Sequence, residues 1–121
     1  KPVLAALIQW DALVAAAQNV RRAYVEPPKF PKVVRDLALV VPAGTAYGTL
    51  VAGLKSAPVK TLEGIELFDV YQGKGLPEGT MSYGVRLTFR DPSKTLQDQQ
   101  VEGAIQRMLD GAKQHCGATL R

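Results

Sequence analysis

Residues 81–113 read MSYGVRLTFRDPSKTLQDQQVEGAIQRMLDGAK, and the spacing of their apolar side chains changes once along the stretch. Up to Phe89 these side chains alternate with small or polar ones, which predicts a half-buried strand over residues 81–90 that Asp91-Pro92 ends. Beyond the break they recur every three or four positions, which predicts an amphipathic helix that opens on a capping-box-like pair, Thr95 and Asp98. The strand turns Tyr83, Val85, Leu87 and Phe89 to one side, and the apolar face of the helix is Val101, Ala104, Ile105, Met108, Leu109 and Ala112.

The flanking residues complete an order of six elements. Gly117 is placed to close the helix, which leaves residues 118–121 as a short final strand. Upstream, residues 33–41 and 64–71 are expected to be strands, joined by a helix from about Thr45 in which Gly48 and Gly53 each cost about 1 kcal/mol relative to alanine. This order predicts an α+β fold of the ferredoxin-like β-α-β-β-α-β type: a four-stranded antiparallel sheet with two helices on one face and the first and third strands in the centre.

Residues 1–28 differ from the rest of the chain. An apolar stretch and an alanine-rich segment lead to Arg21-Arg22 and the breaker Glu26-Pro27-Pro28, which favours an extended linker. We expect residues 1–28 to be the tail of a preceding module plus a connector, and residues 29–121 to be the folded domain. Residues 3–10 fit either an orphan strand or an arm packed on the domain, and the lack of an initiator methionine suggests an excised piece.

The composition restricts the class of protein. Fifteen Lys and Arg against eleven Asp and Glu give a net charge of +4, which favours a polyanionic partner about as much as it favours a merely solvated basic surface. One cysteine and one histidine exclude an intrachain disulfide and a four-ligand zinc site, and they fit a reducing cytoplasm. The apolar run from Val3 to Ile8 is too short to span a bilayer, so no membrane association is expected.

Motifs of catalysis are weak. His115 and Cys116 are neighbours at a helix end and point about 100° apart, so we interpret both as structural or incidental. The glycines of residues 73–79 have neither dinucleotide nor Walker spacing and precede a strand, so we interpret them as a hairpin connection. The carboxylates of Glu63 and Glu66 have no metal-ligand pattern and are expected to form a solvated edge.

The sheet face away from the helices, here called the open face, is the candidate binding surface. Small residues on the central strands would form a shallow floor beside the ring of Tyr71, on which an unpaired base could stack, while Asp69 and Ser82 could read its edge. A bare face that binds nothing is the alternative. Strand alternation assigns Leu37, Leu39, Phe68, Val70, Val85, Leu87 and Phe89 to the helix side, and Ala38, Asp69, Tyr71, Ser82, Gly84, Arg86, Thr88 and Arg121 to the open face. Lys29, Lys32, Arg35, Lys74 and Arg90 are candidate phosphate contacts.

Several ordered strings resemble one family. Phe30-Pro31 precedes Arg35-Asp36-Leu37-Ala38, and Leu67-Phe68-Asp69-Val70-Tyr71, Leu76-Pro77-Glu78-Gly79, Leu87-Thr88-Phe89, Thr95-Leu96 with Asp98, and Gly117-Ala118-Thr119-Leu120-Arg121 follow. Together they resemble the ferredoxin-fold anticodon-binding domain that ends the beta subunit of bacterial phenylalanyl-tRNA synthetase. The resemblance covers about residues 29–121, and residues 1–28 look similar to the end of the catalytic-like module before it. The two glycines of the first helix and the stop at Arg121 depart from some relatives.

The resemblance implies a partner and a set of contacts. The open face would receive the anticodon stem-loop of tRNA-Phe, with Ala38, Asp69, Tyr71, Ser82 and Arg121 at positions that look like anticodon contacts; Arg86 is added from its place on the open face. It also implies that this fragment is not catalytic and holds no cofactor, because ATP and magnesium would be used at an active site elsewhere in an alpha2beta2 heterotetramer. Two other functions stay open: a ferredoxin-like regulatory module that binds a small molecule, and a protein-assembly module.

Overall fold

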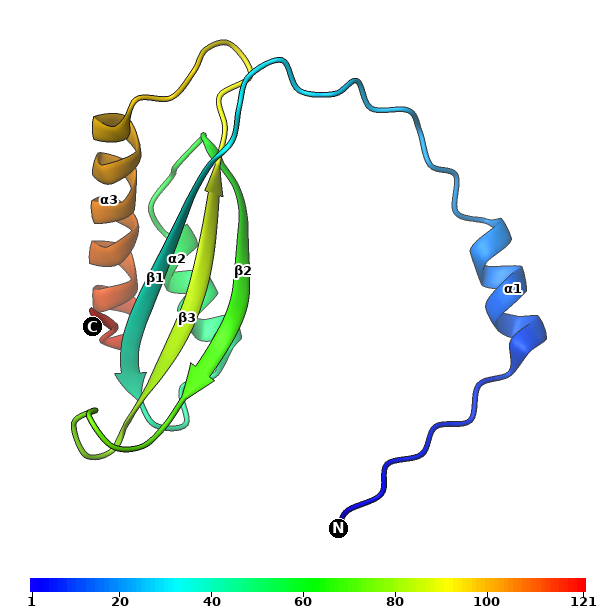
Figure 1. The fold of residues 1–121 in the computed structure, drawn as a ribbon, viewed down its shortest axis with the longest axis horizontal. Coiled ribbons are helices and arrows are strands. Elements are labelled where there is room, and N and C mark those ends of the chain that lie inside the picture. The colour runs from blue at the N-terminus through cyan, green and yellow to red at the C-terminus, as the bar shows by residue number, and fades with distance from the viewer.

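A four-stranded antiparallel sheet and two helices make up the folded part of the chain. The computed structural model describes all 121 residues. The strands β1 (Val33–Pro42), β2 (Leu62–Tyr71), β3 (Thr80–Phe89) and β4 (Thr119–Leu120) lie in the order β2-β3-β1-β4, and each neighbouring pair is antiparallel. The helix α2 (Tyr47–Lys55) follows β1, and α3 (Asp98–Cys116) follows β3 (Figure 1). The ferredoxin-like prediction is confirmed, with β1 and β3 in the centre.

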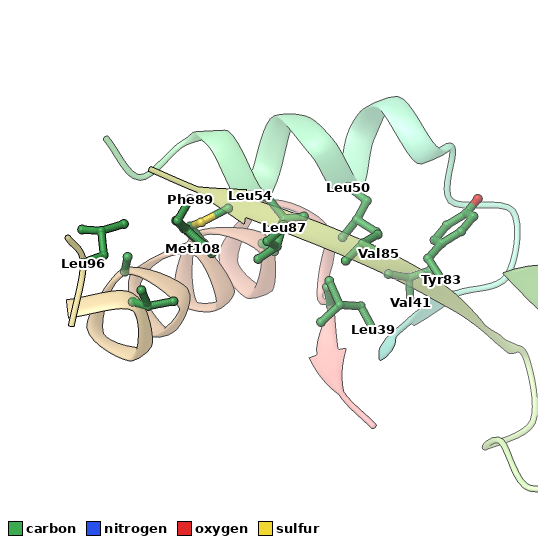
Figure 2. Close-up of a cluster of buried hydrophobic side chains, with 14 residues drawn as sticks. Leu39, Val41, Leu50, Leu54, Tyr83, Val85, Leu87, Phe89, Leu96 and Met108 are labelled. Atoms are coloured by element: carbon green, nitrogen blue, oxygen red, sulfur yellow. The ribbon is translucent and has the colours of Figure 1, made fainter. Parts of the chain in front are cut away.

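One core lies between the sheet and the helices. Leu39 and Val41 of β1 and Val85 and Leu87 of β3 point toward α2 and α3, as Figure 2 shows. Each such side chain contributes about 1.5–3 kcal/mol when it is fully buried. Because the helix residues and the strand residues form one cluster, both helices cover the same face of the sheet. The buried cluster is Leu39, Val41, Leu50, Leu54, Tyr83, Val85, Leu87, Phe89, Leu96, Val101, Ala104, Met108, Ala112 and Ala118.

Small residues let α2 and α3 approach closely. A Cβ atom at Gly53 would stand 2.9 Å from the Cα of Ala112, and one at Gly111 would meet the Ser56 hydroxyl and the Gly53 carbonyl. Gly48 has open space around it and gains nothing comparable. The helical cost of Gly53 is therefore offset by the packing that it permits, whereas that of Gly48 is not.

The start of α3 differs from the prediction. Its N-cap is Gln97, whose side chain forms a capping box with Gln100, so the predicted Thr95–Asp98 pair is wrong. Leu96 is buried in the core, and the chain enters the helix after Leu96 rather than before it. Asp98 instead lies in the first turn, where its charge suits the helix dipole. Gly117, with φ of 71°, closes the helix as predicted.

The N-terminal residues lie apart from the domain. The helix α1 (Trp10–Gln18) has no buried residue, and Figure 1 shows it away from the sheet. Residues 3–9 form no regular element and are exposed, so the packed arm is wrong, whereas the orphan strand, whose pairing partners would lie outside this chain, stays a prediction. A lone strand leaves its backbone groups without partners, whereas the alanines after Trp10 favour a helix. No helix in the chain combines the length and the hydropathy needed to span a membrane.

Candidate nucleic-acid interface

The open face is organised in rows that run across β1, β3 and β2. Paired residues in neighbouring strands point to the same side, and alternate rows contain the buried core residues. The rows between them face away from the helices. Three such rows follow one another along the strands: Asp36, Arg86 and Glu66; then Ala38, Gly84 and Asp69; then Val40, Ser82 and Tyr71. The predicted residues Ala38, Asp69, Tyr71, Ser82 and Arg86 therefore share the open face.

Arg121 joins this face from the opposite edge of the sheet. Its backbone N–H donates to the Ala38 carbonyl at 2.9 Å, which extends the short β4 ladder by one residue. Its guanidinium carbon stands over the Tyr71 ring, 5.6 Å from the ring centroid. Tyr71 belongs to β2 and Arg121 follows β4, so side chains from the two edges of the sheet meet above the central strands. They can do so because Ala38, Ser82 and Gly84 beneath them are small.

The predicted open floor is covered in this arrangement. Ser82 lies between Val40 and Tyr71 and is only 3% exposed, although it points away from the core. The Tyr71 hydroxyl donates to the carbonyl of Lys74 at 2.8 Å, which holds the ring beside the loop of residues 72–79. Tyr71 itself is 37% exposed. A base that reaches Ser82 must therefore displace part of this cover.

Phe68 lies on the open face, so its predicted place on the helix side is wrong. The ladder between β2 and β3 shifts between Leu67 and Asp69, so that Phe68 and Asp69 both lie opposite Gly84. The extra residue is a β-bulge, which aims a side chain to the other face. A Cβ atom at Gly84 would stand 2.9 Å from Cε2 of Phe68, which places the ring directly above the glycine.

A sequence signal for this bulge exists. The core-facing apolar residues of β2 are Ile65 and Leu67, and the next is Val70, a step of three rather than two. With one extra residue between Leu67 and Val70, both side chains lie on the helix side of the sheet, and Val70 lies opposite the buried Tyr83. Val70 is nevertheless 52% exposed at the end of an edge strand.

Arg86 is held by two neighbours. Its Nε and Nη2 atoms each donate to a carboxylate oxygen of Asp36 at 2.8 Å, and its guanidinium carbon lies 5.5 Å from the centroid of the Phe68 ring. The hydrogen bonds from Arg86 are the main reason why the pKa of Asp36 lies below its ordinary value of 3.8. Because the Asp36 carboxylate pairs with its charge and fixes its position, Arg86 lines the open face and is not free to bind a phosphate. Sequence reasoning did not assign this role to Asp36.

The candidate phosphate contacts fall into two groups. Arg35 lies on the helix side and forms an ion pair with Asp98, with its Nη2 at 2.7 Å from the carboxylate oxygen. Arg90 is mostly buried, and its Nε lies 3.4 Å from the Oε2 atom of Glu63. It lines a groove of about 420 Å³ beside residues 26–30. Arg35 therefore points away from the open face, and Arg90 is held beside Glu63 just after the end of β3. The remaining candidates, Lys29, Lys32 and Lys74, are exposed in the segments before β1 and after β2 and form no ion pair.

The residues with catalytic side chains do not converge. His115 is exposed, and the Cys116 thiol donates to the Ala112 carbonyl at 3.3 Å, within its own helix. No group of three or more His, Cys, Asp or Glu side chains could hold a metal ion. On the open face, by contrast, aromatic, cationic and anionic side chains gather around small residues.

Comparison with known proteins agrees with this geometry. Residues 28–121 match the family described as the ferredoxin-fold anticodon binding domain. The phenylalanine–tRNA ligase beta subunit of Dechloromonas aromatica is 44% identical over 114 residues, which cover 94% of this chain and 14% of that protein. The beta subunit of Thiobacillus denitrificans is 43% identical over 95% of this chain and 15% of its own length.

A third relative extends the match through the N-terminal residues. The phenylalanine–tRNA ligase beta subunit of Porphyromonas gingivalis is 36% identical over all 121 residues, which make up 15% of its length. The chain thus spans 14% to 15% of the length of these three relatives. Both the match over residues 28–121 and the observed fold show that the chain belongs to the ferredoxin-fold anticodon-binding domain family.

Proposed function

We propose that the chain is the anticodon-recognition domain of a phenylalanine–tRNA ligase beta subunit and that its open face binds the anticodon stem-loop of tRNA-Phe. The observation that carries this proposal is the arrangement around Tyr71. An exposed aromatic ring lies beside the free carboxylate of Asp69 and beneath Arg121, on a sheet whose other face packs against both helices. Single-stranded RNA is recognised by stacking of unpaired bases on such rings and by polar groups at the base edges.

Each residue of the site has a role in this proposal. Tyr71 stacks on a base, Asp69 accepts hydrogen bonds from an exocyclic amino group, and the Ser82 hydroxyl reads a base edge once Arg121 moves aside. Ala38 supplies the close approach that a larger side chain would prevent. Arg121 exchanges its contact with Tyr71 for a contact with the RNA, while Arg86 stays on Asp36 and shapes the edge of the site.

The charge arrangement limits how strongly salt weakens binding. Lys29, Lys32, Lys74 and Arg121 are exposed and form no ion pair, whereas Arg35 and Arg86 are paired. Four neutralised phosphates give a slope of about −3 for the logarithm of affinity against the logarithm of salt concentration, and fewer contacts give a shallower slope.

The remaining steps of the reaction are proposed to lie outside this domain. The relatives are parts of a tRNA ligase, and no three His, Cys, Asp or Glu side chains gather here to hold a metal. We propose that ATP, magnesium and phenylalanine are handled by another part of the parent enzyme, an alpha2beta2 heterotetramer in the cytoplasm. Residues 1–28 as the tail of a preceding module remain a prediction.

The test is a titration of the 121-residue chain with the tRNA-Phe anticodon stem-loop and with a stem-loop of altered anticodon, each at two salt concentrations. The proposal predicts tighter binding of the tRNA-Phe loop at both concentrations and a salt slope no steeper than about −3. Equal affinity for the two loops contradicts anticodon recognition. No measurable binding of either loop contradicts RNA binding by this chain.

A further inference from the structure

Phe68 is an apolar ring in a position that the core does not explain. It is 51% exposed on the open face, whereas Leu67 before it packs against the core. Counted back from Asp69 and Tyr71 on the open face, plain alternation would turn Phe68 toward the helices, but the bulge between Leu67 and Asp69 leaves Phe68 and Asp69 on the same face. Bulges of this kind re-aim side chains and occur frequently beside functional sites. The exposure of the ring thus results from a specific feature of the backbone.

The surroundings of Phe68 parallel those of Tyr71. Phe68 lies over Gly84, and Tyr71 lies opposite Ser82, two residues away on the same side of β3. Two residues of a strand span about 6.6 Å, so the rings occupy neighbouring positions along one line. An arginine accompanies each ring, with Arg86 at 5.5 Å from the Phe68 centroid and Arg121 at 5.6 Å from the Tyr71 centroid.

The ring of Phe68 is held ready in the free protein. Gly84 provides the space that it occupies, and the two hydrogen bonds to Asp36 fix Arg86 at its side. About half of the Phe68 surface stays exposed with Arg86 in place, so a flat ligand finds apolar surface without displacing the ion pair. The exposed carboxylate of Asp69 follows Phe68 in sequence and faces the same side.

We propose that Phe68, with Arg86 fixed beside it, is a second base-stacking position that takes an unpaired nucleobase next to the base on Tyr71. This inference rests on the proposed function and adds a site to it. The site takes two successive bases of a single strand, one on each ring, and the carboxylate of Asp69 lies between them. Stacking on Phe68 strengthens binding for any base, because every base has a π face.

The first test compares three variants by fluorescence anisotropy with the tRNA-Phe anticodon stem-loop. Phe68→Leu keeps apolar bulk over Gly84 but removes the ring, and we expect affinity to fall by about 5- to 150-fold. Phe68→Tyr keeps the ring and should bind within about 2-fold of the unaltered chain. Val70→Ala is the matched control, because Val70 is equally exposed on the same strand but points to the other side, and its affinity should not change.

The second test locates the bases directly. A 2-aminopurine placed in turn at each anticodon position should be quenched at two adjacent positions by the unaltered chain. Tyr71→Leu should relieve one of them and Phe68→Leu the other. Quenching at a single position, or full affinity of Phe68→Leu alongside weakened Tyr71→Leu, overturns the second stacking position and leaves the proposed function intact. If Phe68→Leu does not fold, the number of quenched positions in the unaltered chain decides the question.

Discussion

Replacing Gly84 with alanine tests the bulge geometry on which the open face depends. The added Cβ atom would stand 2.9 Å from the Cβ of Asp69, 2.9 Å from Cε2 of Phe68 and 3.0 Å from its Cζ. The Phe68 ring can rotate away, but the Asp69 Cβ is attached to the bulged backbone and moves only with it. Overpacking of this kind costs about 1–3 kcal/mol. For a domain of this size, the melting temperature should fall by roughly 4–8 °C per kcal/mol.

The matched control is Gly64→Ala on the neighbouring strand. A Cβ atom at Gly64 has no atom within 4 Å, and its φ is not in the left-handed region. Alanine there reduces the entropy of the unfolded chain, so we expect stability to stay within about 1 kcal/mol of the unaltered chain. Thermal and urea unfolding followed by circular dichroism measure both variants. Equal stabilities for Gly84→Ala and Gly64→Ala would refute the placement of Phe68 and Asp69 above Gly84.

Two further changes test the helix contact and the ion pair. Gly53→Ala should destabilise the chain by about 1–3 kcal/mol, because its Cβ would stand 2.9 Å from the Cα of Ala112, while Gly48→Ala should stabilise it by about 0.5 kcal/mol in urea unfolding; the same sign for both would contradict the close approach of α2 and α3. Asp36→Asn removes the carboxylate that accepts from Arg86. Because folding lowers the pKa of Asp36, its contribution to stability is full above its ordinary value of 3.8 and is lost as the pH falls through the folded value. The urea midpoints of Asp36→Asn and the unaltered chain should thus differ at about pH 7 and converge once the pH falls below the lowered pKa of Asp36, and a constant difference would contradict the role of Asp36.

Much of the fold follows from periodicity alone. The residues of α3 that repeat every three or four positions all lie in the core or pack against it, and the alternation in β1 and β3 assigns their two faces correctly. These patterns are reliable because the spacing of apolar residues repeats over several helical turns or several residues of a strand. Helix caps depend on one or two residues, and Gln97 with Gln100, rather than Thr95 with Asp98, forms the cap of α3.

The site was predicted less completely because it depends on register. A single inserted residue in β2 reverses the facing of Phe68 while leaving Tyr71 and Asp69 where alternation placed them. The pairing of Arg86 with Asp36 requires knowing which residues of β1 and β3 lie opposite one another, across a separation of 50 residues. Composition contains no such information.

The contact of Arg121 with Tyr71 was also beyond the sequence. It joins a residue after β4 to a residue of β2 across the whole width of the sheet. Only the small side chains of the central strands hinted at free space there, and the structure shows that this space is covered in the free chain, with Ser82 only 3% exposed.

The proposed function requires that RNA binds the sheet face opposite α2 and α3. Backbone amide chemical shifts of the 121-residue chain, followed by NMR during titration with the tRNA-Phe anticodon stem-loop, test it residue by residue. We expect the largest changes at Ala38, Asp69, Tyr71, Ser82 and Arg121, with little change along the outer surface of α3. Changes concentrated on α2 and α3, with the amides around Tyr71 and Ser82 unmoved, would contradict it.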